Sequence, residues 1–292
     1  IESAGFEGNE KLLSIVIPAN VEYIGDHAFN NCTSLENITF EKGSKLTEIS
    51  SAAFGYCKKL CSLEIPASVT SIATSSSGFV YGNYGMTSLT VADGNTVYHS
   101  KNNCIIETAT KSLIAGCKTS TIPTDGSVVV IESGAFDRSN ISSIVIPESV
   151  TDIKMWTFGR CDSLKEITIL NKNTNIANDV YAIYAGTTII GYRGSTAEAY
   201  AKKYNRTVVM LECKNHNFSH TYDYDTDNHW LECIDCGKKK DITAHIFDNS
   251  CDTTCDTCGY TRNITHNYEQ KYDENSHWDE CKVCGDRQNV VS

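Results

Sequence analysis

Residues 14–40 read SIVIPANVEYIGDHAFNNCTSLENITF, and two motifs in this stretch decide the fold. In the first motif an aliphatic residue is followed five positions later by phenylalanine, as Ile24 is by Phe29. In the second, apolar residues stand at positions one, four and six, as in Leu35, Ile38 and Phe40. Neighbouring copies of the first motif begin 22 to 25 residues apart, which indicates an internal repeat. Its other copies are Ile1 to Phe6, Ile49 to Phe54, Ile131 to Phe136 and Ile153 to Phe158.

The second motif predicts a short strand, because apolar and polar residues alternate along it. A unit of one strand and one turn cannot bury its own apolar face, but stacked copies can. Pro18, Pro66 and Pro147 each follow a predicted strand directly and, lacking an N–H group, end it there. The sequence therefore predicts a mainly β solenoid of short strands and turns, in which the repeated phenylalanines stack into a column.

Residues 14–40 resemble the BspA-type leucine-rich repeat, a family of surface proteins of anaerobic bacteria and some parasitic protists. The resemblance covers about residues 1–210. Residues 95–123 are similar to the longer repeat variant of this family, and residues 187–204 to its closing segment, whose helix caps the last coil. Ile1 falls on a repeat anchor, so we expect further repeats upstream. The resemblance implies an extracellular or cell-surface protein that adheres to a host or matrix protein, a glycan or a neighbouring cell.

The residues between the apolar anchors of each strand are expected to point outward and to form a binding surface for a protein or glycan. The alternative is a solvated sheet face without a ligand. We call this surface the strand face. It consists of Ser14, Val16, Asn37, Thr39, Ser62, Glu64, Ser88, Thr90, Ser143, Val145, Glu166 and Thr168.

The six cysteines of the predicted solenoid are interpreted as core residues. Cys32, Cys57 and Cys161 each lie three residues after a repeat phenylalanine, which predicts a small buried side chain in the same place of each coil. Cys104 and Cys117 are expected in the core of the longer repeat, with a disulfide between them as an alternative. No catalytic constellation is found, so the protein is expected not to be an enzyme.

The last 80 residues differ in composition, because residues 213–292 hold eight of the 14 cysteines and six of the eight histidines. We therefore predict a second domain over 211–292, a Cys/His repeat domain with little regular structure. Its motif, a ligand followed by x3-Cys-x2-Cys-Gly, occurs three times. Two intervening residues let both sulfurs reach one metal ion, and the glycine lets the chain turn. The three sets are His229, Cys233 and Cys236; Cys251, Cys255 and Cys258; and His277, Cys281 and Cys284.

Each set needs a fourth ligand, and two schemes supply one. In the downstream scheme His245 completes the first set and His266 the second, while the third needs a histidine near position 292 or 293. In the upstream scheme His220, His245 and His266 complete the three sets in order. Regular spacing favours the downstream scheme, and completeness favours the upstream one. Cys213 and His216 are left over in both.

Zinc is the ion expected for mixed thiolate and imidazole ligands, and its role is expected to be structural. Disulfides are the rival interpretation, but histidine replaces cysteine at the first position of two sets, which suits a metal ligand and not a disulfide. Few large aliphatic residues are available in this region for a core. The array resembles zinc-knuckle-like repeats found beside BspA-type repeats on bacterial surfaces.

Charge and hydropathy exclude some partners. The chain of 292 residues carries a net charge of -11, and residues 213–292 hold 15 acidic against eight basic residues, so nucleic acid is not expected as a partner. No apolar run approaches the roughly 18 residues of a membrane span. We expect a monomeric, non-enzymatic surface protein that recognises a ligand; the alternative is a surface spacer or scaffold without a specific ligand.

Overall fold

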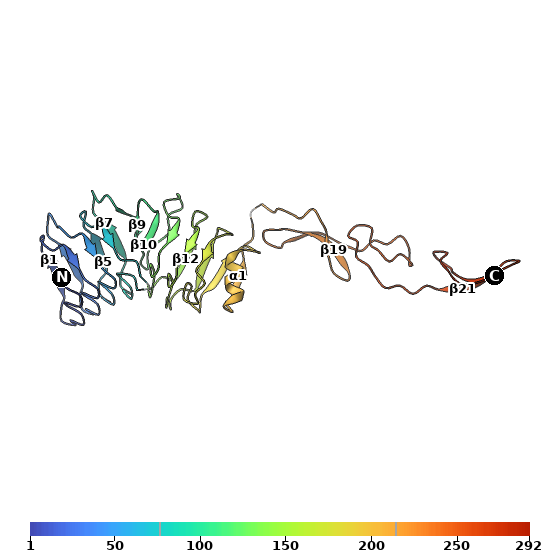
Figure 1. Cartoon of the computed structure of the whole chain (residues 1–292), viewed down its shortest axis with the longest axis horizontal. Helices are drawn as coiled ribbons and strands as arrows, with labels where there is room; N and C mark the ends of the chain where they lie inside the picture. Colours follow the sequence, from blue (N-terminus) through green and yellow to red (C-terminus); the bar gives the residue numbers. More distant parts are fainter. Residues whose placement is uncertain (76, 214) are drawn as a thin grey trace. The chain divides into compact units, whose positions relative to one another are not determined.

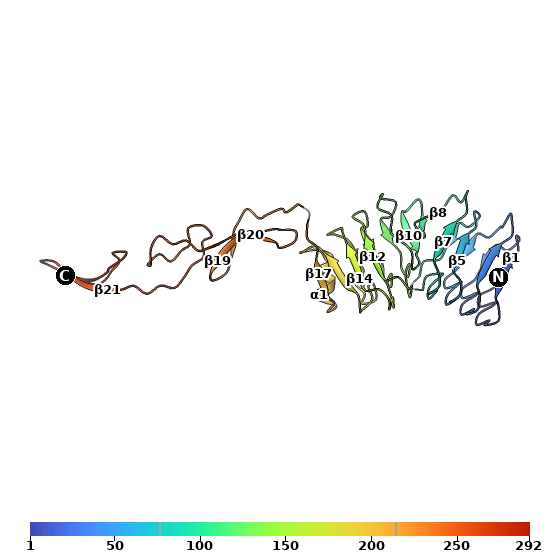
Figure 2. The ribbon, with the colours of Figure 1, turned by 180° about the vertical axis from the view of Figure 1, so that it is seen from behind.

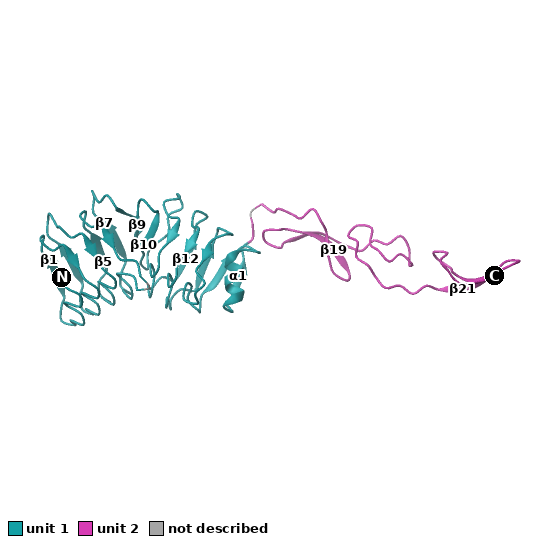
Figure 3. Cartoon of the chain, in the orientation of Figure 1, with its two compact units in different colours: residues 1–211 teal, residues 212–292 magenta. Residues whose placement is uncertain are grey.

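The computed structural model describes residues 1–75, 77–213 and 215–292. The chain divides into two compact units, Ile1–Leu211 and Glu212–Ser292, which Figure 3 colours teal and magenta. Unit 1 is a β-solenoid, and unit 2 consists of hairpins and tight loops. No helix in the described residues is both long and apolar enough to cross a membrane.

Strands of three or four residues form the front of the solenoid, and they lie side by side in Figures 1 and 2. Parallel ladders join β1 to β3, β5 to β7, and β12 through β14 and β16 to β17. Pro18, Pro66 and Pro147 follow β1, β5 and β12 directly, as predicted. The front strands are β1 (Ser14–Ile17), β3 (Asn37–Phe40), β5 (Ser62–Ile65), β7 (Ser88–Val91), β12 (Ser143–Ile146), β14 (Glu166–Ile169), β16 (Thr188–Gly191) and β17 (Val208–Met210).

A second row of two-residue strands closes each coil behind the front strands. These strands pair in parallel from coil to coil, which gives the solenoid a second set of backbone hydrogen bonds. They are β2 (Tyr23–Ile24), β4 (Glu48–Ile49), β6 (Ser71–Ile72), β11 (Val130–Ile131), β13 (Asp152–Ile153) and β15 (Asn175–Ile176). The longer repeat predicted over 95–123 adds an antiparallel meander to this row. It consists of β8 (Tyr98–Lys101), β9 (Cys104–Glu107) and β10 (Ser112–Ala115).

The repeat phenylalanines stack in columns inside the solenoid. The rings of Phe6 and Phe29 lie 5.1 Å apart at 3°, and those of Phe29 and Phe54 lie 5.6 Å apart at 9°. Phe136 and Phe158 continue the arrangement at 5.2 Å. The predicted stacking is confirmed in two runs, Phe6 to Phe54 and Phe136 to Phe158, and every ring except Phe6 is fully buried.

The closing segment predicted over 187–204 contains α1 (Thr196–Lys203), the one α-helix in the described residues. Ser195 caps it by accepting a hydrogen bond from the Glu198 amide. Ala197, Tyr200 and Ala201 are buried against the last coils, so the helix covers apolar surface that the open end of the stack would expose.

Unit 2 contains two antiparallel three-stranded hairpin sheets. The first, module 1, is β18 (Asp223–Tyr224), β19 (Asn228–Glu232) and β20 (Lys239–Ala244). The second, module 3, is β21 (Tyr268–Tyr272), β22 (His277–Cys281) and β23 (Arg287–Val291). Module 2, residues 246–262, lies between them and is a loop with a bridge from Thr254 to Thr261.

Candidate metal centres and recognition face

The strand face points outward, as the alternation of the sequence indicates. In β3 and β5 the residues between the apolar anchors are exposed, while Ile38 and Leu63 are buried. Val16 and Val145 are large apolar residues on this face, and each exposes more than half of its surface. All twelve residues of the strand face are exposed or half-buried.

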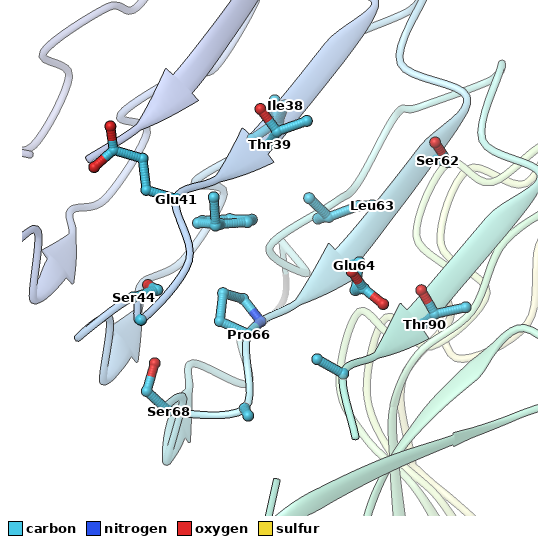
Figure 4. A pocket seen from close by; sticks show the side chains of 14 residues that line it. Ile38, Thr39, Glu41, Ser44, Ser62, Leu63, Glu64, Pro66, Ser68 and Thr90 are labelled. Carbon is cyan, nitrogen blue, oxygen red and sulfur yellow. The ribbon is translucent and has the colours of Figure 1, made fainter. Parts of the chain in front are cut away.

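The front sheet is interrupted between β3 and β5, because no ladder joins these two strands. The turn after β3 spans residues 41–47, two residues more than the turns after β1 and β5, which span 18–22 and 66–70. Glu41, Gly43 and Ser44 of the longer turn line a hollow of about 670 Å³. Figure 4 shows this hollow from close by. It also contains four strand-face residues, which are Thr39, Ser62, Glu64 and Thr90.

Five of the six solenoid cysteines are buried thiols, whereas Cys61, which directly precedes β5, is exposed, so the core position expected for it is wrong. The Cys57 thiol donates to the Phe29 carbonyl at 3.2 Å, and that of Cys161 donates to the Phe136 carbonyl at 2.9 Å. Cys32 makes the same bond to Phe6 at 3.1 Å. Burial raises the pKa of Cys57 and Cys161 to about 12, so neither is a thiolate at neutral pH. Cys104 and Cys117 are also buried and free.

The three Cys-x-x-Cys-Gly loops of unit 2, which we call knuckles, share one backbone geometry. In each, the glycine amide bonds to the carbonyl of the first cysteine, at 2.8 to 3.0 Å. Gly237, Gly259 and Gly285 have φ between 73° and 75°, a conformation that glycine adopts without steric cost. The recurring glycine is therefore explained by the turn that brings the two cysteines together.

Backbone amides inside the knuckles favour the thiolate of each first cysteine. Burial raises the pKa of Cys233 and Cys255, but amide N–H groups outweigh it and bring both to about 6. In Cys281 the amides of Cys284 and Val283 are the leading cause, and the pKa falls to about 5. The amides therefore favour the charged, metal-binding form of these three sulfurs, whereas burial raises the pKa of their neighbours Cys213 and Cys251 to about 12 and 11.

Twelve cysteine and histidine residues gather into three clusters of four, and within each cluster the candidate ligand atoms all lie within 4.8 Å of one another. A tetrahedral zinc ion separates its sulfur and nitrogen ligands by roughly 3.3 to 3.8 Å. The Sγ atoms of Cys213 and Cys233 lie 3.4 Å apart, which fits that spacing. Cluster 1 is Cys213, His216, Cys233 and Cys236; cluster 2 is His229, His245, Cys255 and Cys258; cluster 3 is Cys251, His266, Cys281 and Cys284.

Each cluster histidine presents Nδ1 to a cysteine sulfur, at 3.1 to 3.8 Å. In cluster 2 the other ring nitrogens have partners too. Nε2 of His229 lies 2.9 Å from the Thr243 hydroxyl, and Nε2 of His245 lies 2.9 Å from the Asp225 carbonyl oxygen. A partner on Nε2 fixes the ring orientation and leaves Nδ1 for a metal ion. The donor set and its supports therefore fit zinc.

The clusters differ from both schemes that the spacing suggested. The four cysteines and histidines of a cluster do not come from one motif: His229 is grouped with the second knuckle and Cys251 with the third. In the described part of the chain, neither His220 nor His277 belongs to a cluster, and both are exposed. Cys213 and His216, the two residues left over in the sequence, join cluster 1 instead. Their x2 spacing, which matches that of a knuckle, was the available signal.

A stack of coils with one short strand per turn and a column of phenylalanines defines a leucine-rich repeat solenoid. The chain belongs to the family described as BspA type leucine rich repeat region, which matches in six copies over residues 1–108 and 95–184. No curated protein matches the sequence.

Solved structures of bacterial leucine-rich repeat proteins share the fold. A leucine rich cell surface protein from Faecalibacterium prausnitzii is 22% identical with a TM-score of 0.52, and the match covers 73% of this chain and 64% of that one. The pneumococcal vaccine antigen PcpA is 18% identical with a TM-score of 0.46, over 73% of this chain and 71% of its own. At these identities the likeness concerns the fold alone.

Proposed function

We propose that this protein is a cell-surface recognition protein that binds a protein or glycan ligand through the strand face. The hollow between β3 and β5 carries the proposal, because it places a concave site on the face that the sequence predicts to be outward. Membership of the BspA-type family supports a non-enzymatic binding role, and the name of the Faecalibacterium protein supports a surface location. Adhesion to a host, matrix or neighbouring cell surface is the biological role we infer.

The lining of the hollow suits a ligand with both polar and apolar parts. Hydroxyl groups come from Thr39, Ser62 and Thr90, and a carboxylate from Glu64. The apolar residues of the lining include Leu63 and Pro66, both largely buried. Clefts that combine a few convergent polar groups with apolar walls are the usual form of a binding site.

Filling the hollow tests this proposal. Ser62→Trp places a bulky side chain in it, whereas Ser143→Trp makes the same change at the same strand position of β12, away from the hollow. On an array of glycans and matrix proteins, we expect Ser62→Trp to weaken binding at least tenfold and Ser143→Trp to retain it. If the folded wild-type protein binds nothing above background, the spacer or scaffold role replaces recognition.

We further propose that the three clusters of unit 2 hold zinc in a structural role. Four protein ligands per cluster leave no open coordination position for a substrate. The glutamates beside the knuckles are engaged elsewhere: Glu232 and Glu280 accept hydrogen bonds from Trp230 and Trp278 at 3.3 and 2.9 Å. They are therefore not placed as a general base, and zinc here stabilises a unit that has little core of its own.

A further inference from the structure

No copy of the repeated motif in unit 2 supplies all the ligands of one metal site. His229 precedes Cys233 by four positions, yet its Nδ1 lies 3.8 Å from the Cys255 Sγ of the next knuckle. Cys251 likewise precedes Cys255 by four positions, and its Sγ lies 3.4 Å from the Cys281 Sγ of the third knuckle. The first residue of the motif thus reaches forward into the following site.

For His229, the strand conformation explains this arrangement. His229 lies in β19 and Cys233 follows its end, so four extended residues separate their Cα atoms by roughly 13 Å. An imidazole and a thiolate that far apart along a strand cannot share one ion. His277 and Cys281 stand at the two ends of β22, and the same limit applies to them.

We propose that the three zinc ions interlock the tail, each ion fastening one module to the segment before it. Cluster 1 joins Cys213 and His216, which follow the solenoid, to the first knuckle. Cluster 2 joins His229 of module 1 and His245, which directly follows β20, to the knuckle of module 2, and cluster 3 joins Cys251 of module 2 to the knuckle of module 3. This inference rests on the proposed binding of zinc in unit 2.

Besides these sites, the described residues show few contacts between successive modules; one is the edge-on packing of Tyr224 in module 1 against Tyr260 in module 2, with ring centroids 5.5 Å apart. The buried apolar residues of unit 2 are Trp230 and the first cysteines of the knuckles, Cys233, Cys255 and Cys281. Such a core is too small to offset the conformational entropy of ordering three modules. Each ion therefore holds one module to the segment before it. Loss of one ion should make that one connection flexible, while the other two sites keep their ions.

Two variants distinguish interlocked sites from sites built within each motif. The double variant Cys213→Ala/His216→Ala removes two of four ligands from cluster 1, and we expect it to bind two zinc ions where the wild type binds three. His277→Ala removes no cluster ligand, so we expect three ions with unchanged affinity. Sites built within the motifs predict the reverse, with three ions in the double variant and a third site weakened at least tenfold in His277→Ala.

Native mass spectrometry of the whole chain counts the ions, and titration with a chromophoric chelator gives their affinities. Circular dichroism of the solenoid verifies that each variant is folded. A wild-type protein without zinc would refute the proposed metal binding itself. A wild-type protein with three ions that loses one in His277→Ala, or none in the double variant, would refute only the interlocking. His220→Ala is a further control and is expected to keep all three ions.

Discussion

Asp137 is the one acidic residue that unit 1 buries within the described part of the chain, and only 4% of it is exposed. Its Oδ1 has no hydrogen-bond partner, and Arg138 Nε lies 3.8 Å from Oδ2. Burial raises the pKa of Asp137 to about 7, although the charge of Arg138 opposes this effect. The folded solenoid therefore holds this proton over a pH range in which the unfolded chain has already lost it.

This difference predicts a pH-dependent cost at Asp137. Because the folded-state pKa lies above the ordinary value of 3.8, the contribution of this group to the free energy of unfolding falls as pH rises from about 4 to 7, by at most about 4 kcal/mol. Asp137→Asn should therefore gain stability relative to the wild type over that range. Denaturation midpoints at pH 4 to 8 test this, with the exposed Asp162→Asn as the control; parallel curves for wild type and Asp137→Asn would contradict it.

The repeated cysteine of the solenoid gives a second prediction. Serine stands in its place at Ser139, where Oγ lies 3.7 Å from the Cys161 Sγ. Cys57→Ser retains a donor for the Phe29 carbonyl, whereas Cys57→Ala removes both the donor and the sulfur volume, at a cost of about 1 to 2 kcal/mol. We expect Cys57→Ser to unfold at a higher denaturant concentration than Cys57→Ala, and the opposite order would show that the hydrogen bond is unimportant.

At the scale of elements, α1 is fastened to the last coils by the Tyr200 hydroxyl. That hydroxyl accepts a hydrogen bond from the Ile183 amide at 3.2 Å and donates one to the Asp179 carbonyl at 2.9 Å. Tyr200→Phe leaves a buried amide unpaired and should lower the free energy of unfolding of unit 1 by about 1 to 3 kcal/mol.

Tyr204→Phe is the matched control, because the Tyr204 hydroxyl bonds to Asn178 at an exposed position. Chemical denaturation followed by circular dichroism measures both variants. Equal effects of the two substitutions would mean that α1 does not depend on the buried bond.

Sequence reasoning found the elements whose signals repeat. The period of the two motifs and the three prolines were enough to predict six of the eight front strands and the stacking of the phenylalanines, but not β16 and β17. Phe79 was missed, because it lies seven and not five residues after Ile72, although its carbonyl accepts the Phe54 amide at 2.8 Å in the coil-to-coil pattern. The break between β3 and β5 was missed as well, because two added residues in one turn carry no signal of their own.

The grouping of metal ligands could not be predicted from spacing. The twelve predicted ligands were assigned to sites as though each motif formed one site; ten of them lie in the three clusters, whereas His220 and His277 do not. The extended conformation of β19 decides otherwise, since it separates His229 from Cys233. Had a strand been predicted over residues 228–232, it would have indicated that His229 is too far from Cys233 and shares a metal site with the next knuckle.

At the scale of the whole molecule, the chain combines a unit that is stable through apolar burial with a unit that lacks such a core. Unit 1 contains nearly all of the buried apolar residues. Unit 2 contains four of them, and three are cysteines at candidate metal sites. We therefore expect chelation to unfold unit 2 while the solenoid keeps its circular dichroism signal and its melting temperature.

The zinc and thiol content of the wild-type chain tests the account most directly. Protein prepared without chelators or added reductant should contain three zinc ions per chain, as counted by native mass spectrometry. Removal of the zinc should then make the eight cysteines of unit 2 titrate as free thiols. A chain with no zinc and no titratable thiols in unit 2 would contradict the account, because it would mean that disulfides hold this unit together.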